Sequence, residues 1–125
     1  MKPPTVYNAD AKETIMDIKH RDIGGVSVLD FTGNLDTNTS PAAESEVSRL
    51  LDEGSNKILF TFGELNFISS SGLRILLATA KKLKMSDGKM VVCNLNDVVQ
   101  EVFDISGFAS ILNLAANEEE ALASF

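Results

Sequence analysis

Apolar and polar positions alternate in the first patterned part of the chain. Met16, Ile18 and His20 fall on one side of this alternation, and a period of two residues is typical of a half-buried β-strand. The glycine pair at 24–25 permits the positive φ angles of a tight turn. A second strand-like run follows at 26–32, so we expect a β-hairpin here.

Beyond this hairpin, continuous apolar runs alternate with runs of helical period. Three short runs are typical of buried, parallel strands: 57–62, 90–95 and 111–114. Apolar positions recur every three or four residues in four other segments, which predicts helices: 40–53, 73–85, 97–106 and 117–125. Because strands and helices alternate, right-handed crossovers are expected. The prediction is an α/β fold with a mixed β-sheet that is opened by an N-terminal β-hairpin and flanked by about four helices.

Local residues refine two of these helices. Ser40 is followed by Pro41, and this pair is typical of an N-cap and a first helical residue. In the segment 97–106 the apolar period predicts that Val98 and Val99 both face inward.

The composition is that of one ordinary globular domain, with 125 residues, 44% hydrophobic and 23% charged. Residues 1–13 contain a proline pair and show no periodicity, so we expect a flexible N-terminal arm before a single domain at 14–125. The formal net charge of −7 argues against nucleic acid or an anionic membrane as a partner. We find no signal peptide and no membrane-spanning run, which favours a cytoplasmic protein.

Few side chains are available for catalysis. The only histidine is His20, in a strand, and the residue two before Ser70 is Ile68 where a nucleophile elbow needs glycine. The only cysteine, Cys93, lies in an apolar run and is expected to be buried. Phosphate-binding loops, dinucleotide fingerprints and metal-ligand spacings are not found. We therefore expect no enzymatic activity and no metal site.

A polar turn at 69–71, three serines followed by a glycine, lies between the apolar run at 57–62 and the helix at 73–85. A strand, a turn and a helix in this order leave free N–H groups at the helix start. A hydroxyl there can cap the helix. It can also accept a phosphate, which brings a charge of about −1.5 to −2 that the helix dipole stabilises. The residues alone leave both roles open.

The serine segment reads Phe67-Ile68-Ser69-Ser70-Ser71-Gly72-Leu73 and resembles the signature of the STAS domain, the fold of bacterial anti-sigma-factor antagonists. The core of that signature is Asp-Ser-Ser/Thr-Gly-Leu, and its first serine is the phosphoacceptor. The resemblance places the acceptor at Ser70, with Ser69 and Ser71 as less favoured alternatives. The run Gly33-Asn34-Leu35-Asp36 looks like the family's Gly-x-Leu/Ile-Asp motif, so a STAS-like fold is expected.

The resemblance also implies a function, that of an anti-sigma-factor antagonist in a partner-switching pathway. Such a protein binds an anti-sigma factor that is also a serine kinase of the histidine-kinase-like ATPase type. Phosphorylation switches the binding off, and a PP2C-type phosphatase resets it. ATP and metal belong to those partners, so the resemblance implies that this chain has no cofactor. The expected partner-binding residues follow the two motifs: Asp36, Ser69, Ser70, Ser71, Gly72 and Arg74.

Two further expectations depend on these residues. The loops that contain Asp36 and the three serines both follow strands, so they are expected to lie side by side at one edge of the sheet. Arg74 comes four residues after Ser70, which on a helix brings it near a phosphate or a partner's acidic group.

Two other functions remain open. Ser69 stands where the family has an acidic residue, which fits a non-phosphorylated STAS subunit of a larger signalling or transport complex. A small hydrolase is the third hypothesis, and it rests on an exposed serine alone.

Overall fold

The computed structural model describes residues 16–125, so the arm predicted at 1–13 lies outside the described residues. The elements follow one another in this order: β1 (Met16–Ile23), β2 (Val26–Leu35), α1 (Ser40–Asp52), β3 (Lys57–Ile68), α2 (Ser70–Met85), β4 (Lys89–Cys93), α3 (Asp97–Ser106), the short 3₁₀ helix η2 (Phe108–Ser110), β5 (Asn113–Ala115) and α4 (Glu118–Ala123).

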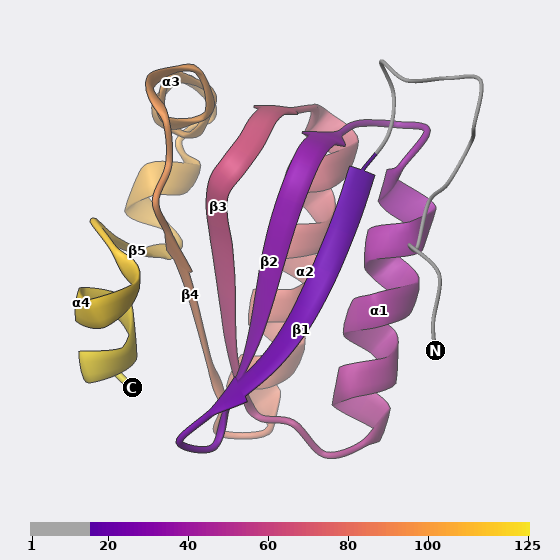
Figure 1. Ribbon diagram of the computed structural model, residues 1–125, viewed down its shortest axis with the longest axis vertical. Helices are drawn as coiled ribbons and strands as arrows, with labels where there is room; N and C mark the ends of the chain where they lie inside the picture. Colours follow the sequence, from indigo (N-terminus) through magenta and orange to yellow (C-terminus); the bar gives the residue numbers. More distant parts are fainter. Residues whose placement is uncertain (1–15) are drawn as a thin grey trace.

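The five described strands form one mixed sheet in the order β1-β2-β3-β4-β5 (Figure 1). The hairpin strands β1 and β2 are antiparallel, and every other neighbouring pair is parallel. Gly24 and Gly25 make the hairpin turn with φ angles of 56° and 84°, which glycine adopts at little cost. The predicted α/β fold, with an N-terminal hairpin and about four helices, is confirmed.

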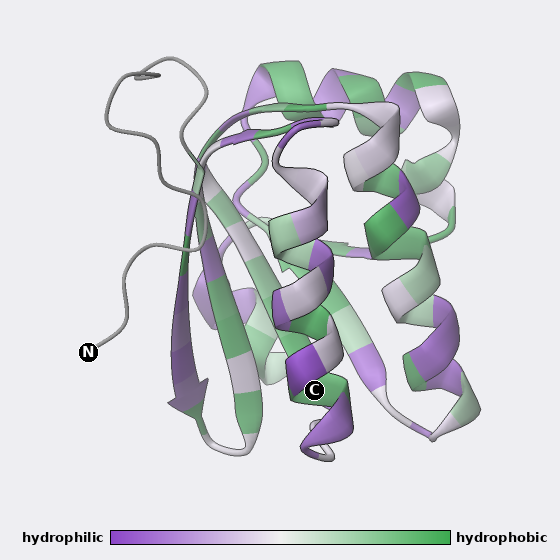
Figure 2. Ribbon diagram, turned by 90° about the vertical axis from the view of Figure 1, so that its right-hand side faces the viewer, coloured by the Kyte–Doolittle hydropathy of each residue, from purple (hydrophilic) through white to green (hydrophobic). Residues whose placement is uncertain are grey.

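Successive strand residues face opposite sides of the sheet, and each side has its own apolar cluster. On the side of α1 and α2, three rings pack together, with centroid separations of 5.6 Å between Phe31 and Phe60 and 5.4 Å between Phe31 and Phe62. On the other side, α4 packs a smaller cluster that includes Leu59 and the buried Cys93. Figure 2 shows hydrophobic and hydrophilic segments alternating along the helices, as expected for helices with one buried face.

An ion-pair cluster connects the hairpin to α4. Arg21 on β1 donates to both carboxylate oxygens of Asp30 on β2, at 2.7 and 2.9 Å, and to Glu118 at 2.7 Å. Thr61 on β3 also donates to Asp30. Burial acts to raise the pKa of Asp30, but the hydrogen bonds from Arg21 and Thr61 outweigh it and hold this pKa below its ordinary value. The hydrogen bond to Asp30, and then the one to Glu118, raise the pKa of Arg21.

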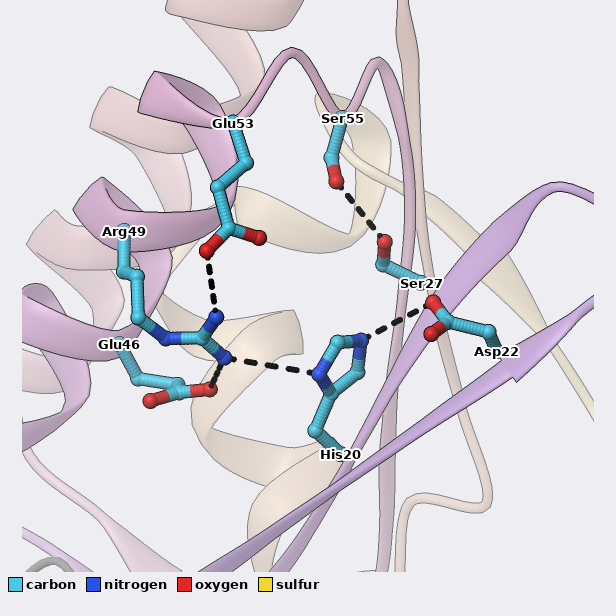
Figure 3. Close-up of polar contacts among 7 residues, drawn as sticks. All are labelled: His20, Asp22, Ser27, Glu46, Arg49, Glu53 and Ser55. Atoms are coloured by element: carbon cyan, nitrogen blue, oxygen red, sulfur yellow. Dashed lines mark hydrogen bonds and ion pairs between the residues drawn. The ribbon is translucent and has the colours of Figure 1, made fainter.

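A second polar cluster connects β1 to α1 (Figure 3). Glu46 and Glu53 both bind the guanidinium of Arg49, the latter at 2.9 Å. His20 lies 3.1 Å from Asp22 and 3.5 Å from Arg49. The histidine side chain is therefore partly buried between a strand and a helix.

Two strands extend beyond their predicted ends. The second strand was expected over 26–32 and reaches Leu35, and the third was expected over 57–62 and reaches Ile68. Their parallel pairing continues through two register shifts, between Asp30 and Thr32 and between Gly33 and Asn34. Polar residues in these extensions indicated loops, but Leu35 and Ile68 are buried and hold the strands on the core.

A helix cap, the orientation of one side chain and the ends of the last strand also differ from the prediction. Ser40 is the first residue of α1 and not its N-cap, because the cap position is Thr39. Val98 has 55% of its surface exposed, whereas Val99 is buried. The last strand spans Asn113–Ala115 in place of the expected 111–114.

Candidate functional site

The candidate site lies at the carboxyl ends of β2 and β3. Leu35 and Ile68, the last residues of the two strands, are paired in the sheet. The N–H of Ser69 then donates to the carbonyl of Leu35 at 2.9 Å. The two following loops are thereby held together, and the hydroxyls of Thr37 and Ser71 lie 3.3 Å apart. The prediction that these loops lie side by side is confirmed.

The three serines have three different environments. Ser69 is the N-cap of α2, with extended backbone angles, and its Oγ accepts from the N–H of Gly72 at 3.4 Å. Ser71 is half-buried and contacts Thr37. Ser70 is exposed, and its hydroxyl has no hydrogen-bond partner among residues 16–125. Ser70 is therefore the hydroxyl that a second protein can reach with the least rearrangement.

Gly72 is buried beneath this turn. A Cβ atom at this position would lie 2.8 Å from Ile68 Cγ1 and 2.8 Å from Leu35 Cγ. Such distances are too short for carbon atoms in van der Waals contact. The glycine lets the first turn of α2 approach the ends of β2 and β3. Its predicted role in partner binding stays a prediction, and the structure gives it a packing role.

Asp36 organises the loop between β2 and α1. One carboxylate oxygen, Oδ1, accepts from the N–H groups of Asn38 at 2.9 Å and Thr39 at 3.1 Å. Its backbone carbonyl accepts from the N–H of Ser40 at 2.8 Å. This is the Asx-turn geometry that aspartate favours ahead of a helix. Asp36 therefore shapes the loop that contains Thr37.

Arg74 is exposed on the next turn of α2 and lies beside a cleft of about 430 Å³ between α1 and α2. Ser71 and Lys82 line the same cleft. Within the described residues no carboxylate lies within ion-pair distance of Arg74, whereas Arg21 and Arg49 are each bound by two. The guanidinium of Arg74 is available to a group from outside the fold or to a phosphate nearby.

The described part of the chain offers no support for hydrolysis at this site. The hydrogen-bond partners of His20 are Asp22 and Arg49, so the histidine does not activate a serine. Residues 16–125 contain no cluster of three or more His, Cys, Asp or Glu side chains that would hold a metal ion. Nor does this part of the chain include a helix long and apolar enough to cross a membrane.

Sequence reasoning missed two features of the site. One is the contact between Thr37 and Ser71, which depends on the pairing of two distant strands. The other is the cleft and the presence of Lys82 in its wall. Arg74, Ala78 and Lys82 follow one another at intervals of four residues, which places them on one face of a helix. That spacing was the sequence pattern from which the shared face of Arg74 and Lys82 could have been predicted.

Comparison with known proteins gives a family and two informative relatives. The sequence model described as "STAS domain" matches residues 17–121. BtrV of Bordetella bronchiseptica, which carries the name of an anti-sigma factor antagonist, is 37% identical over 103 residues, covering 82% of this chain and 89% of BtrV. The anti-sigma F factor antagonist of Paenibacillus polymyxa is 30% identical over 99 residues, covering 78% of this chain and 85% of that protein.

Solved structures show the same fold. A crystal structure of an anti-sigma factor antagonist from Mycobacterium paratuberculosis superposes with a TM-score of 0.82 at 24% identity, covering 89% of this chain and 94% of that one. The phosphorylated form of the Bacillus cell fate determinant SpoIIAA superposes with a TM-score of 0.67 at 24% identity, covering 86% and 97%.

Proposed function

The chain belongs to the STAS domain family, and from this premise we propose that it is an anti-sigma-factor antagonist whose binding is switched off by phosphorylation of Ser70. The observation that carries the proposal is the environment of Ser70. It is the one serine of the turn that is exposed and whose hydroxyl has no partner within residues 16–125, and it begins a helix of 16 residues. The names of the two relatives above support the regulatory role.

The proposed partner is an anti-sigma factor that is also a serine kinase of the histidine-kinase-like ATPase type. It would bind the surface around Ser70 when the serine is unmodified and would then transfer a phosphate to it. A PP2C-type phosphatase would remove the phosphate. Because ATP and its metal ion belong to the kinase, this chain needs no catalytic residue or cofactor of its own. The proposed pathway places the protein in the cytoplasm.

The helix start explains how a phosphate could be accommodated without unfolding. The first N–H groups of an α-helix have no partner within the helix, and the N-terminal end of the dipole favours negative charge. In α2 the N–H of Gly72 is bound by Ser69 Oγ and that of Leu73 by the carbonyl of Ser69. The N–H groups of Ser70 and Ser71 have no partner within residues 16–125, so they are available to a phosphate on Ser70.

Arg74 gives the phosphate a second interaction. It follows Ser70 by four residues, so both lie on one face of α2. A phosphate adds about −1.5 to −2 charges and strong acceptor oxygens. The modified surface would then repel an acidic group of the partner and occupy the arginine that such a group would use. The switch therefore acts on the charge of the surface and not on the fold.

Ser69 fits this account although the family has an acidic residue at that position. Serine and aspartate are both preferred N-caps, and Ser69 caps α2 through its Oγ. The substitution keeps the helix start intact and removes one fixed negative charge next to Ser70. The structure therefore gives no reason to favour a non-phosphorylated subunit over a phosphorylated antagonist.

The test is a binding measurement with each purified serine kinase of the histidine-kinase-like ATPase class that the same genome encodes. The kinase that binds wild type should bind Ser70→Ala with similar affinity and Ser70→Asp about tenfold more weakly, since a fixed charge imitates part of the phosphate. Ser45→Asp is the matched control, because it makes the same change at an exposed serine of α1 that lies outside the serine turn and does not line the cleft. If phosphorylated and unphosphorylated wild type bind equally well, the proposal is wrong.

A further inference from the structure

The cleft between α1 and α2 begins beside the serine turn that contains Ser70. Thr37 and Ser71, whose hydroxyls lie 3.3 Å apart, line its end beside Ser70. From there it runs along the two helices, which lie side by side on one face of the sheet (Figure 1). Its volume of about 430 Å³ is within the range of functional pockets in proteins.

The charges in the cleft differ from those of the whole chain. Arg74 and Lys82 line it, and among residues 16–125 Glu44 on α1 is the one acidic residue whose side chain lines it. The chain as a whole carries a formal net charge of −7. Within the described residues neither Arg74 nor Lys82 is paired with a carboxylate. The cleft therefore attracts negative charge on a protein that otherwise repels it.

The spacing of the two cations indicates the size of the ligand. Arg74 and Lys82 are eight residues apart on α2, which is a rise of about 12 Å at 1.5 Å per residue. This spacing matches a ligand that carries two separate acidic groups. A protein segment with two acidic side chains about 12 Å apart contacts both at once.

Four apolar side chains line the cleft between the two cations, together with hydroxyl-bearing residues of both helices. Val47 and Leu51 contribute from α1, and Ile75 and Ala78 from α2. Val47 is buried, Leu51 and Ile75 are half-buried, and Ala78 is exposed. Apolar side chains of a docked segment would remove this surface from water. The cleft thus combines apolar side chains with a cation at either end.

We propose that the cleft between α1 and α2 binds an acidic, amphipathic segment of the same kinase that recognises Ser70. The segment places one carboxylate at Arg74, a second at Lys82 and apolar side chains between them. This inference rests on the proposed function and extends its binding surface by about three helical turns. A phosphate on Ser70 would compete with the carboxylate of the segment for Arg74, which lies about one helical turn from Ser70. Lys82 lies about 18 Å from Ser70 along the helix, so the phosphate does not reach it.

Lys82 therefore tests the cleft separately from the switch. Lys82→Glu should weaken the complex with the kinase by about tenfold, since a pair of opposite charges becomes a pair of like charges. Lys81→Glu is the matched control, because it makes the same change of charge on the neighbouring residue, which does not line the cleft. It should leave the affinity within about twofold of wild type. Glu44→Gln should tighten the complex by about twofold to threefold, since it removes the acidic group of the cleft.

The outcomes separate the two proposals. In one outcome, Ser70→Asp weakens the complex with the kinase, whereas Lys82→Glu and Lys81→Glu bind the kinase with equal affinity. The cleft is then not a binding site, and the proposed role of Ser70 is unaffected. If no kinase of the class binds wild type, both proposals fall. A third outcome is that wild type forms concentration-dependent dimers, and that Lys82→Glu abolishes the dimers without weakening the kinase complex. The cleft would then bind a second copy of the chain, and the inference would be wrong.

Discussion

Two arginines show how the molecule divides its polar groups. Arg21, on the side of the sheet covered by α4, is held by Asp30 and Glu118 at distances of 2.7 Å each. Arg74, on the side of α1 and α2, has no carboxylate partner within residues 16–125. The first arginine connects β1, β2 and α4. The second is exposed on α2, one turn from an exposed serine.

The difference separates a region that stabilises the fold from a region available for binding. Buried side-chain nitrogen and oxygen atoms all have hydrogen-bond partners in the described part of the chain. Satisfied groups of that kind contribute to stability, whereas exposed groups without partners contribute little. Changes in the first region should alter the free energy of unfolding. Changes at Ser70 and Arg74 themselves should alter binding and leave stability nearly unchanged.

The largest effect is expected at Gly72, which packs the first turn of α2 on the ends of β2 and β3. Gly72→Val should lower the free energy of unfolding by about 2–3 kcal/mol, because the added carbons overlap Leu35 and Ile68. Urea denaturation monitored by circular dichroism measures this change. A variant as stable as wild type would show that α2 shifts easily on the strands, and the packing role given to Gly72 would be wrong.

The next effect concerns the ion-pair cluster. Arg21→Met should lower the free energy of unfolding by about 1–2 kcal/mol, since it leaves two carboxylates without their shared donor and the site is partly exposed. Lys57→Met is the control, because Lys57 lies exposed on β3, carries the same charge and has no ion pair within the described residues. The control should change stability by about 0.5 kcal/mol or less. If the two substitutions lower the free energy of unfolding equally, the ion-pair cluster does not stabilise the fold more than an ordinary exposed charge does.

A smaller effect distinguishes two neighbouring serines. Ser69→Ala should cost about 1 kcal/mol of stability, because it removes the N-cap of α2. Ser70→Ala should change stability by about 0.5 kcal/mol or less, because the hydroxyl has no partner among the described residues. The same denaturation experiment compares them. If Ser70→Ala is the more destabilising of the two, Ser70 is a structural residue and the proposed division of roles is wrong.

The smallest effect is a dependence of stability on pH. Since the pKa of Asp30 is held below its ordinary value of 3.8, its carboxylate stabilises the fold above that pH, and this contribution is lost as the pH falls below it. Wild type should therefore lose stability more steeply than Asp30→Asn as the pH drops below about 4. Parallel curves for the two proteins would show that Arg21 and Thr61 do not lower the pKa of this carboxyl group.

The same two regions show what the sequence can predict. The alternation from Met16 and the apolar runs were sufficient for the hairpin, the mixed sheet and the four helices, because strand and helix periods are local properties. The ends of the strands were not predictable in this way. Gly33 and Asn34 have the composition of a loop but pair with β3 through a register shift. Of two adjacent valines, only Val99 is buried, since periodicity does not specify the side of α3 that packs on the sheet.

The candidate site was predictable in position but not in detail. The strand, serine turn and helix placed Ser69, Ser70 and Ser71 at a helix start from sequence alone. Their separate environments depend on other segments, since Ser69 is positioned by Leu35 and Ser71 by Thr37. The cleft depends on the packing of α1 against α2. Such long-range contacts have no local sequence pattern.

The central claim is that Ser70 is the serine that is modified, and phosphosite mass spectrometry tests it most directly. The protein should be purified from the cells that produce it, under several growth conditions, and the peptide that covers residues 67–74 should be fragmented so that the three serines are resolved. The account predicts phosphate on Ser70 in at least one condition, because Ser69 caps the helix and Ser71 contacts Thr37. Phosphate on Ser69 or Ser71 alone, or an unmodified peptide in every condition, would contradict it.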